Sequence, residues 1–511
     1  MSHLFQRSFR AIYRHLSVWQ DVLRDSRLTS LIVGRLLFLS GGFCFCFALV
    51  GVRLIDLMVL SRASTRVWKV QNHVSDGGVP RADIVDRNGA VLATHLVTAS
   101  VYADTREIQN VNEAAELLAS VLSESSKEEL LRKLESGKSF IWLARHITPK
   151  RQYAIQHLGL PGVYLKKDYK RVYPYGALAC HIIGCCDVDG YGLSGVENHF
   201  NSLLLGAADP LKLSIDIKIQ HIMSELLASA VKEFRAIGGN AIVMDAQTGE
   251  IIAMESLPNV DLNKFNTAQA DDLFNRNTLG VYEMGSVFKV LNTAIALESG
   301  KVTKGSLFDA RAPIKIGRFQ VTDFRGKNQI MTLEDAFVYS SNIAAVKIAI
   351  QFGGGAVQKK FFTKFGVFDP VLIELPEIGR PIYPQRWTDA TMMSSTYGYG
   401  LAVSPLRMLT LVNGISCGYF VCPTLLFGKE KVERRQIVSP NTSACIRHLM
   451  RRVVCEGTAK RANIKGYGVF AKTGTAYKNH KGSYDKQRSR RTVFIGGFPE
   501  YAPKYMVIFM L

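Results

Sequence analysis

The chain has 511 residues, of which 47% are hydrophobic and 21% are charged, and its formal net charge is +20. This length predicts two or three domains, and this composition excludes a disordered chain or one that lies wholly within a membrane. The basic residues are scattered, with neither an aromatic-rich RNA motif nor a zinc-finger spacing, so the charge favours anionic envelope polymers or lipid headgroups over nucleic acid.

An uncharged run of 17 residues, Leu36 to Val52, has an arginine at each end. Long arginine side chains can reach the lipid headgroups on either side of an apolar run, which predicts a membrane-spanning helix at residues 36–55. A cleaved signal peptide is the alternative, but the run begins late and no clear cleavage site follows it. Six arginines against two aspartates in residues 1–35 favour a cytoplasmic N-terminal segment, although basic residues also follow the run.

The region after this run contains no pattern that indicates catalysis. Two strand-like stretches within Arg81 to Ala93 surround a turn at Asn88–Gly89, which predicts a β-hairpin. Residues 105 to 160 are predicted to be mainly helical, because apolar residues recur there at helical spacing. Residues 56–205 are therefore expected to form a pedestal for the rest of the chain.

A change in composition near residue 206 marks the start of a second domain. It opens with a strand and an amphipathic helix, and Ala241 to Asp245 and Ile251 to Met254 then predict a β-hairpin. A helix that is apolar on nearly every side follows, and more strands lie near the C-terminus. This order predicts an α/β fold with antiparallel strands and with helices inserted in the middle of the sheet.

The first turn of that apolar helix contains a candidate nucleophile. Ser286 and Lys289 are spaced so that both side chains lie on one face of a helix, where the amine can take the hydroxyl proton. The positive end of a buried helix would also stabilise an oxyanion beside Ser286. The S-x-x-K pattern is weak alone, since Ser229–Lys232 and Ser483–Lys486 also match it.

Two further segments of the second domain carry polar groups suited to catalysis. Ser340 and Asn342 offer a hydroxyl and an amide that could relay a proton and bind a peptide group, although S-x-N is a common pattern. Lys472 to Gly474 is the only K-T-G of the chain, and its cation and hydroxyl suit a substrate carboxylate. The nine cysteines show no metal-binding spacing, so no metal and no cofactor are expected.

The order S-x-x-K, S-x-N, K-T-G within one domain resembles that of class B penicillin-binding proteins, and most closely the FtsI-like septal peptidoglycan transpeptidases. The likeness continues outside these motifs. Arg81 to Ala93 resembles the family's juxtamembrane segment, and Gly192 to Glu197 resembles its G-x-x-G-x-E motif. Thr396 to Leu401, followed by Ser404 to Leu406, is similar to the septal S-Y-G-Y-G-L and T-P-L, which favours division over elongation.

The resemblance implies a penicillin-binding transpeptidase fold of the α/β (α+β) class, in which an antiparallel sheet carries helices on both faces. It implies a cytoplasmic segment at 1–35, a transmembrane anchor at 36–55 and an elongated periplasmic pedestal of the dimerisation type at 56–205. The transpeptidase domain would occupy 206–511. Relatives continue past the last strand into a helix that covers one sheet face, so this domain is expected to lack the usual C-terminal helix.

The resemblance also implies acyl transfer. Ser286 would attack the carbonyl between the two terminal D-alanines of a stem peptide, and an amine from a neighbouring strand would then take the acyl group and cross-link the wall. Lys289 would be the base, because burial beside Lys472 lowers its pKa. Ser340 would pass the proton to the leaving amine. β-Lactams would acylate the same serine because they mimic the scissile bond.

The remaining site residues would bind the substrate. Asn342 would hold its amide, and Lys472 and Thr473 would bind its terminal carboxylate. Gly474 permits close approach of the backbone, and the N–H of Thr475, together with that of the nucleophile, would form the oxyanion hole.

The resemblance implies, as partners, peptidoglycan stem peptides, β-lactam antibiotics, the inner membrane, a membrane glycosyltransferase and other division proteins. Three alternatives stay open: a catalytically weakened division scaffold, an elongation-type transpeptidase, and a β-lactam sensor or β-lactamase on the same fold. No glutamate-bearing deacylation motif supports hydrolysis. The roughly 150 residues between the predicted anchor and the second domain are too few for a polymerase domain.

Overall fold

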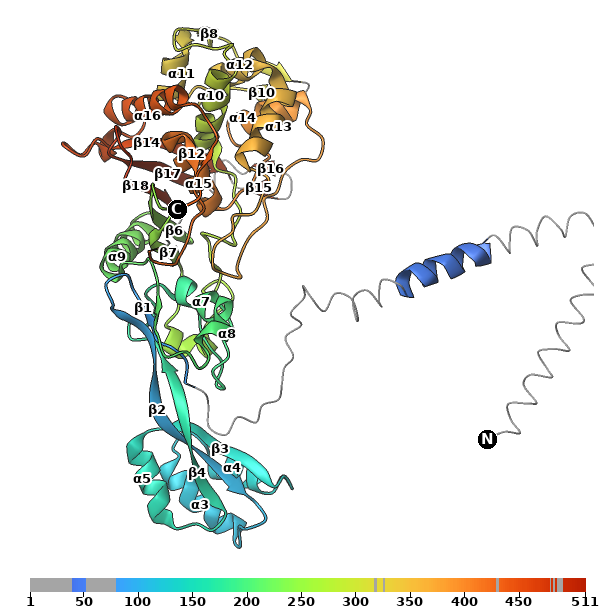
Figure 1. Ribbon diagram of the computed structural model, residues 1–511, viewed down its shortest axis with the longest axis vertical. Coiled ribbons are helices and arrows are strands. Elements are labelled where there is room, and N and C mark those ends of the chain that lie inside the picture. The colour runs from blue at the N-terminus through green and yellow to red at the C-terminus, as the bar shows by residue number, and fades with distance from the viewer. Residues whose placement is uncertain are drawn as a thin grey trace, which may run out of the picture. The chain divides into compact units, whose positions relative to one another are not determined.

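The computed structural model describes residues 39–51, 80–316, 319–324, 327–428, 432–477, 479–480, 483–484 and 490–511. The chain divides into two compact units, Met1–Val74 and Ser75–Leu511. The described part of the first unit is one helix at residues 39–51, blue in Figure 1. Within the part of the chain that the structure describes, no helix is both long and apolar enough to cross a membrane. The predicted cytoplasmic segment and both ends of the predicted anchor lie outside the described residues.

The pedestal, described from residue 80, is built around one long strand. This strand, β2 (Val91–Asp104), pairs antiparallel with β1 (Ile84–Val85), β3 (Phe140–Ile147) and β4 (Val163–Val172). The pairing of β1 with β2 confirms the predicted hairpin. Figure 1 shows β2 and β4 side by side over most of their length. The short strand β5 (Leu211–Lys212), which follows the predicted boundary at 206, pairs parallel with β1.

Three helices cover one face of the sheet at the end of the pedestal. They are α3 (Val111–Val121), α4 (Lys127–Leu134) and α5 (Pro149–Leu158). Alternate residues of β2 such as Val101 are buried against them, because successive side chains of a strand point to opposite faces. The prediction of a mainly helical segment here is right for the three helices but wrong for β3, whose aromatic and branched residues favour a strand.

A buried ionic cluster joins distant parts of the pedestal. Glu197 is fully buried in α7 (Gly195–His199) and accepts hydrogen bonds from Nε and Nη2 of Arg81, at 3.0 and 2.8 Å, and from Nε of Arg171, at 2.6 Å. These three residues come from the start of the hairpin, the end of β4 and the motif G-x-x-G-x-E. The cluster therefore fixes the position of three segments at once. Two other short helices lie here: α6 (Cys180–Ile183) and α8 (Asn201–Leu204).

The second domain contains an antiparallel sheet of five strands in the order β14-β17-β18-β6-β7. These strands are β6 (Gly239–Asp245), β7 (Ile251–Leu257), β14 (Phe470–Tyr477), β17 (Arg490–Phe498) and β18 (Tyr505–Met510). The predicted hairpin and C-terminal strand are confirmed. The last strand pairs with β6 in the centre of the sheet, so the sheet forms only when the two ends of the domain meet.

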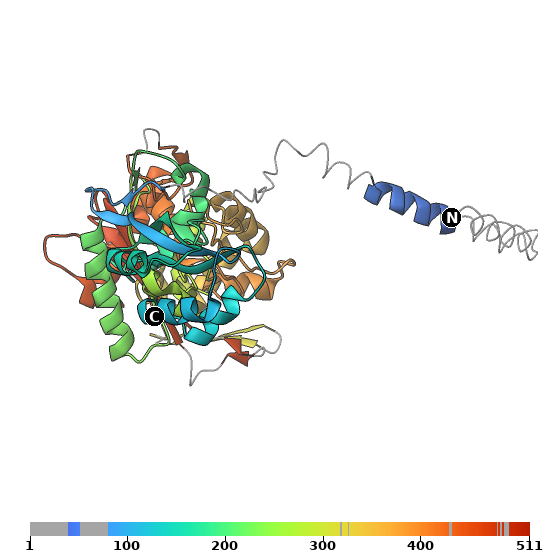
Figure 2. The same cartoon turned by 90° about the horizontal axis from the view of Figure 1, so that it is seen from below.

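Helices lie on both faces of this sheet, as predicted. On one face, α9 (Ile217–Glu233) packs against β6 and β7, with Met223 beside Ala241. The next residue of β6, Ile242, points the other way into the large core that contains α15 (Pro405–Cys417). Figure 2 shows α9, in green, along the outside of the second unit.

The helices between β7 and β14 surround α10 (Phe288–Glu298), in which nine of the eleven residues are buried. This confirms the predicted buried helix, and the neighbours of α10 include α12, α13, α14, α15 and α16. The helical elements of this part are η3 (Leu262–Thr267), η4 (Gly285–Val287), α11 (Leu333–Val338), α12 (Asn342–Phe352), α13 (Gly354–Phe365), α14 (Asp389–Thr396), α16 (Pro440–Cys455) and η5 (Lys460–Ala462). The short strands are β8 (Leu307–Asp309), β9 (Ile314–Ile316), β10 (Phe319–Val321), β11 (Ile330–Thr332), β12 (Tyr419–Phe420), β13 (Arg435–Gln436), β15 (Asn479–His480) and β16 (Ser483–Tyr484).

The buried cluster in the pedestal predicts a large effect of one substitution. Glu197→Ala leaves two buried guanidinium groups without their carboxylate, which is expected to lower the free energy of unfolding by about 3–5 kcal/mol. Urea denaturation measures this loss. The control is Glu124→Ala, which removes an ion pair with Arg151 in which the glutamate side chain is 83% exposed, and its unfolding midpoint should stay close to that of the wild type. Equal midpoints for both variants would contradict the role of the cluster.

Candidate active site

The three predicted motifs come from three different elements and meet at one edge of the sheet. Ser286 lies in the 3-10 turn η4 that leads into α10, and it is partly exposed. Ser340 to Asn342 joins α11 to α12. Lys472 to Thr475 belongs to β14, the edge strand of the sheet, and η4 packs against this strand.

Two glycines allow the turn with the serine to lie directly against β14. Gly285 has a φ of +53°, and a Cβ atom there would lie 2.5 Å from the carbonyl oxygen of Thr475. A Cβ atom on Gly474 would lie 2.5 Å from the carbonyl oxygen of Met284. Both distances are too short for any side chain, so the glycines are needed for the contact between the two backbones.

The segment that resembles the septal subfamily forms another wall of this site. A Cβ atom on Gly398 would lie 2.1 Å from the carbonyl oxygen of Gly285. The N–H of Gly400 donates to Oε1 of Glu283 at 2.7 Å, and the N–H of Tyr477 donates to the hydroxyl of Tyr399 at 3.2 Å. This segment therefore holds the approach to Ser286 on one side and the end of β14 on the other.

The hydroxyl of Ser340 lies between two buried amines. The Nζ atom of Lys289 donates to Oγ of Ser340 at 3.2 Å, to its carbonyl oxygen at 2.5 Å and to Oδ1 of Asn342 at 2.7 Å. The Nζ atom of Lys472 donates to the same Oγ at 2.9 Å and to the carbonyl oxygen of Thr473 at 3.1 Å. The structure thus joins the second and third motifs to the lysine of the first.

In the part of the chain that the structure describes, Ser286 and Lys289 are not joined by a hydrogen bond. Among the described residues, no hydrogen bond connects the hydroxyl of Ser286 with either amine, and the hydroxyl shared by the two amines is that of Ser340. Ser286 lies in the 3-10 turn and Lys289 in the first turn of α10, which continues it, so residues three apart lie on one face of this helical segment. As an ammonium group, Lys289 would use all three of its hydrogens on its present acceptors. Only the neutral amine keeps a lone pair for a proton from Ser286.

Burial lowers the pKa of both lysines. The pKa of Lys289 lies well below its ordinary value, first because the amine is fully buried and second because of the charge of Lys472, while Asp323 acts in the opposite direction. Burial lowers the pKa of Lys472 to about 7. Protonating two buried amines that share one hydroxyl costs free energy because the two positive charges repel, which favours a neutral Lys289.

Asp323 supports the S-x-N segment and was not predicted from the sequence. Its carboxylate accepts hydrogen bonds from the hydroxyl of Ser341 at 2.7 Å and from the N–H groups of Asn342 and Ile343 at 2.5 and 3.0 Å. It therefore caps the start of α12 next to Ser340, whose φ of 59° is unusual for a residue other than glycine. The aspartate lies 19 residues before Asn342, and no local pattern connects the two.

The residues of β14 alternate between two sides of the strand. Lys472 and Gly474 are buried, whereas Thr473 is half-buried and Thr475 is exposed. The hydroxyl of Thr473 hydrogen-bonds that of Thr458 at 2.5 Å, a contact that the sequence did not predict. Lys472 and Thr473 were expected to bind one carboxylate together, but their side chains take different directions from the strand.

The N–H of Thr475 points out of the sheet toward η4. Thr475 pairs with Thr492 of the neighbouring strand β17. The N–H and C=O of Thr492 both hydrogen-bond Leu511, on the side of β17 away from β14. In an antiparallel pair, this directs the N–H and C=O of Thr475 away from β17. The carbonyl oxygen of Thr475 indeed lies against Gly285. An N–H donor at the free edge of β14 thus faces the turn that contains Ser286, as an oxyanion hole requires.

The geometry agrees with comparisons with known proteins. Residues 239–511 match the family model of the penicillin binding protein transpeptidase domain, and residues 77–216 match that of the penicillin-binding protein dimerisation domain. A probable peptidoglycan D,D-transpeptidase FtsI of Caulobacter vibrioides is 33% identical over 93% of this chain and 82% of its own length. The peptidoglycan D,D-transpeptidase FtsI of Escherichia coli K12 is 28% identical over 82% and 76%.

Solved structures share the fold. The match to penicillin binding protein 2X of Streptococcus thermophilus covers 86% of this chain and 76% of the other chain, with a TM-score of 0.70 and 20% identity. Penicillin binding protein 3 of Mycobacterium tuberculosis matches 85% and 90%, with a TM-score of 0.68 and 22% identity. Since the transpeptidase model covers more than half of the chain and a full-length relative exceeds 30% identity, the chain belongs to the class B penicillin-binding proteins of the FtsI-like type.

Proposed function

We propose that this chain is a serine-type peptidoglycan D,D-transpeptidase that cross-links stem peptides during septal cell-wall synthesis and is a target of penicillin. The observation that carries the proposal is the hydroxyl of Ser340 between the amines of Lys289 and Lys472, at 3.2 and 2.9 Å, beside the turn that contains Ser286. The names of the relatives, peptidoglycan D,D-transpeptidases, support this substrate.

In the first half of the reaction, Ser286 attacks the carbonyl carbon between the two terminal D-alanines. Neutral Lys289 accepts the proton of the hydroxyl as the bond between Oγ and carbon forms. The carbonyl oxygen becomes an oxyanion, and the N–H groups of Ser286 and Thr475 donate to it. When the intermediate collapses, the C–N bond breaks and the remaining stem peptide stays on the serine as an ester.

The shared hydroxyl of Ser340 suits the return of the proton. Lys289 donates to Ser340, which can pass a proton to the nitrogen of the leaving D-alanine, so that the amine leaves neutral. In the second half, an acceptor amine enters along the same path and gives its proton to the same pair. The amine forms a new amide bond, the ester C–Oγ bond breaks, and the pair returns the proton to Oγ of Ser286.

The remaining groups hold the substrate. Asn342 is fixed by Lys289 and by a hydrogen bond from Nδ2 to the carbonyl oxygen of Thr322 at 3.0 Å, which orients its amide for a substrate peptide group. Thr473 and Thr475 lie on the accessible side of β14 and bind the terminal carboxylate. Lys472 contributes its positive charge from behind Ser340.

The cellular setting is part of the same proposal. The chain works at the division site, anchored in the inner membrane with its catalytic domain in the periplasm and with a membrane glycosyltransferase and other division proteins as partners. The names of the FtsI relatives and the likeness of Thr396 to Leu401 to the septal subfamily support this setting. A scaffold without turnover is the alternative. It would be excluded if the chain, but not its Ser286→Ala variant, restored growth to a transpeptidase-deficient cell.

Ser286→Ala is expected to abolish covalent labelling by fluorescent penicillin, because it removes the hydroxyl that lies beside the N–H donors of the oxyanion hole. Labelled membranes separated on a denaturing gel measure this. Ser229→Ala is a matched control, since Ser229 belongs to the S-x-x-K match in α9, is exposed and should label as the wild type does. Labelling of the Ser286→Ala variant would refute the assignment of the nucleophile.

The rate of acylation by penicillin should depend on pH through both lysines. Below the lowered pKa of Lys289 the amine is protonated and cannot accept a proton, so the rate should fall toward acid pH. Above the pKa of Lys472, about 7, the site loses a positive charge and the rate should fall again. Stopped-flow measurement of the acylation rate across pH should give a bell-shaped profile. Its two limbs reflect the coupled titration of Lys289 and Lys472. A rate that rises steadily into the alkaline range would contradict this account.

Asp323→Asn is expected to slow acylation about tenfold, because Asn342 and Ser340 lose a charged cap. The substitution should also move the acid limb of the pH profile to lower pH, since Asp323 raises the pKa of Lys289. A purely structural role would reduce the rate without moving this limb. Asp309→Asn removes an exposed ion pair with Arg311 on a nearby strand and should change neither the rate nor the limb.

A further inference from the structure

One edge of β3 in the pedestal is open. Among the described residues, β3 pairs only with β2. The N–H of Thr105 donates to the carbonyl oxygen of Ser139, so the backbone groups of Ser139 point toward β2. Because these directions alternate along a strand, the N–H and C=O groups of Phe140 and Trp142 point outward. Unpaired groups in such a row are a template for another strand.

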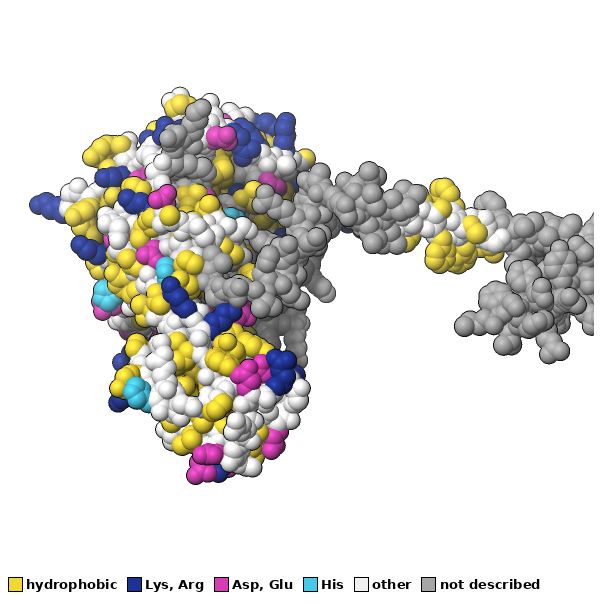
Figure 3. Space-filling model, turned by 60° about the horizontal axis from the view of Figure 1, so that its bottom comes forward, with side chains coloured by type: hydrophobic (Ala, Val, Ile, Leu, Met, Phe, Trp, Pro, Cys, Tyr) yellow, Lys and Arg dark blue, Asp and Glu magenta, His cyan; other side chains and the backbone are white. Residues whose placement is uncertain are grey.

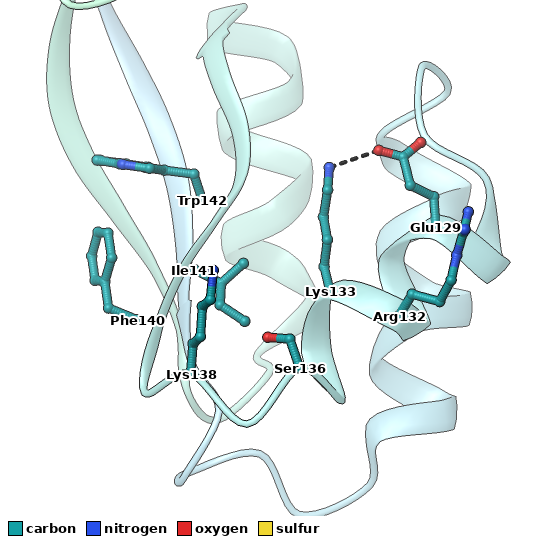
Figure 4. Close-up of a pocket in the computed structure, with 8 residues that line it drawn as sticks. All are labelled: Glu129, Arg132, Lys133, Ser136, Lys138, Phe140, Ile141 and Trp142. Atoms are coloured by element: carbon teal, nitrogen blue, oxygen red, sulfur yellow. Dashed lines mark ion pairs between the residues drawn. The ribbon is translucent and has the colours of Figure 1, made fainter.

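The open edge lies in a hollow of about 590 Å³ between β3 and α4. Figure 4 shows that the lining side chains lie on both sides of the strand, with Ile141 toward α4 and with Phe140 and Trp142 on the other side. The lining residues are Glu129, Arg132, Lys133, Ser136, Lys138, Phe140, Ile141 and Trp142. An added strand here would meet side chains above and below its plane.

The hollow is positively charged. Lys133 pairs with Glu129 at 2.7 Å, which cancels one charge. The exposed side chains of Arg132 and Lys138 have no carboxylate within ion-pair distance among the described residues. Two exposed cations beside an open strand disfavour pairing with a basic strand and favour an acidic one.

Aromatic side chains lie on the face of β3 that points away from α4. Phe140 is 48% exposed and stacks on Tyr102 with ring centroids 4.9 Å apart, and Trp142 meets Phe140 edge to face at 5.1 Å. On the face shown in Figure 3, hydrophobic side chains are exposed among charged groups at the end of the pedestal. Exposed aromatic rings that are already stacked offer contact area at low entropic cost.

We propose that an extended acidic segment of a partner protein binds the pedestal by adding a short strand to the open edge of β3, with its carboxylates beside Arg132 and Lys138 and an apolar side chain against Phe140 and Trp142. The register of β3 is irregular beyond Trp142, which limits the added strand to the first residues of β3. A sugar polymer could stack on the aromatic rings, but its hydroxyls do not repeat a donor and an acceptor at the spacing of a β-strand, as a polypeptide backbone does. This favours a polypeptide.

The test uses the full-length chain in detergent and three fluorescent octapeptides. In the first, glutamates alternate with valines; in the second, lysines replace the glutamates; the third is the first with alternate backbone amides methylated. Fluorescence anisotropy measures binding up to about 1 mM peptide. The glutamate peptide should bind about tenfold more tightly than either of the others, because two charge pairs and the strand hydrogen bonds are both required.

Two variants locate the site. Arg132→Glu with Lys138→Glu should remove the preference for the glutamate peptide. Lys150→Glu with Lys218→Glu changes the net charge equally at exposed positions outside the hollow and should preserve it. Thermal melting curves verify the folding of each variant. Because the readout is peptide binding, the result does not depend on acylation of Ser286.

Three outcomes would overturn the proposal. They are no binding of the glutamate peptide, equal binding of all three peptides, and displacement of the glutamate peptide by an N-acetylglucosamine tetramer, which would assign the aromatic rings to a sugar.

Discussion

The catalytic arrangement depends on one hydroxyl shared by two buried amines. Ser340 Oγ lies 3.2 Å from Nζ of Lys289 and 2.9 Å from Nζ of Lys472, and both lysine side chains are buried. Two buried cations so close together would repel each other strongly: burial lowers the pKa of both lysines, and the charge of Lys472 further lowers that of Lys289. The base is therefore prepared by the same packing that positions the proton relay.

The rest of the second domain keeps this arrangement in place. Lys472 is held by the edge strand of a sheet whose central strand is formed by the C-terminal residues, and Lys289 is held by a helix that is surrounded by other helices. Gly285 and Gly474 let the two elements touch through their backbones. Asp323 then fixes the third element by capping α12. Each lysine thus depends on packing that involves residues far away in the sequence.

In the pedestal, the residues that stabilise the fold and the strand edge proposed to bind a partner lie in different places. Glu197 and its two arginines fix the strands near the second domain, where one buried carboxylate shared by two guanidinium groups leaves little freedom. The open edge of β3, by contrast, has unpaired backbone groups and exposed cations on the far part of the same sheet. A rigid base with an accessible strand edge can bind another protein without disturbing the catalytic domain.

The sequence by itself determined the elements and the motifs. Hydrophobic spacing predicts α10 and the β6–β7 hairpin. The order S-x-x-K, S-x-N, K-T-G can be recognised in the sequence because acyl transfer requires those residue types. Only the tertiary structure showed that Ser340, rather than Ser286, lies between the amines, that Asp323 and Thr458 support the site, and that β3 interrupts a mainly helical segment. These features are contacts between residues distant in the chain, and local patterns carry no information about which distant partner a side chain will meet.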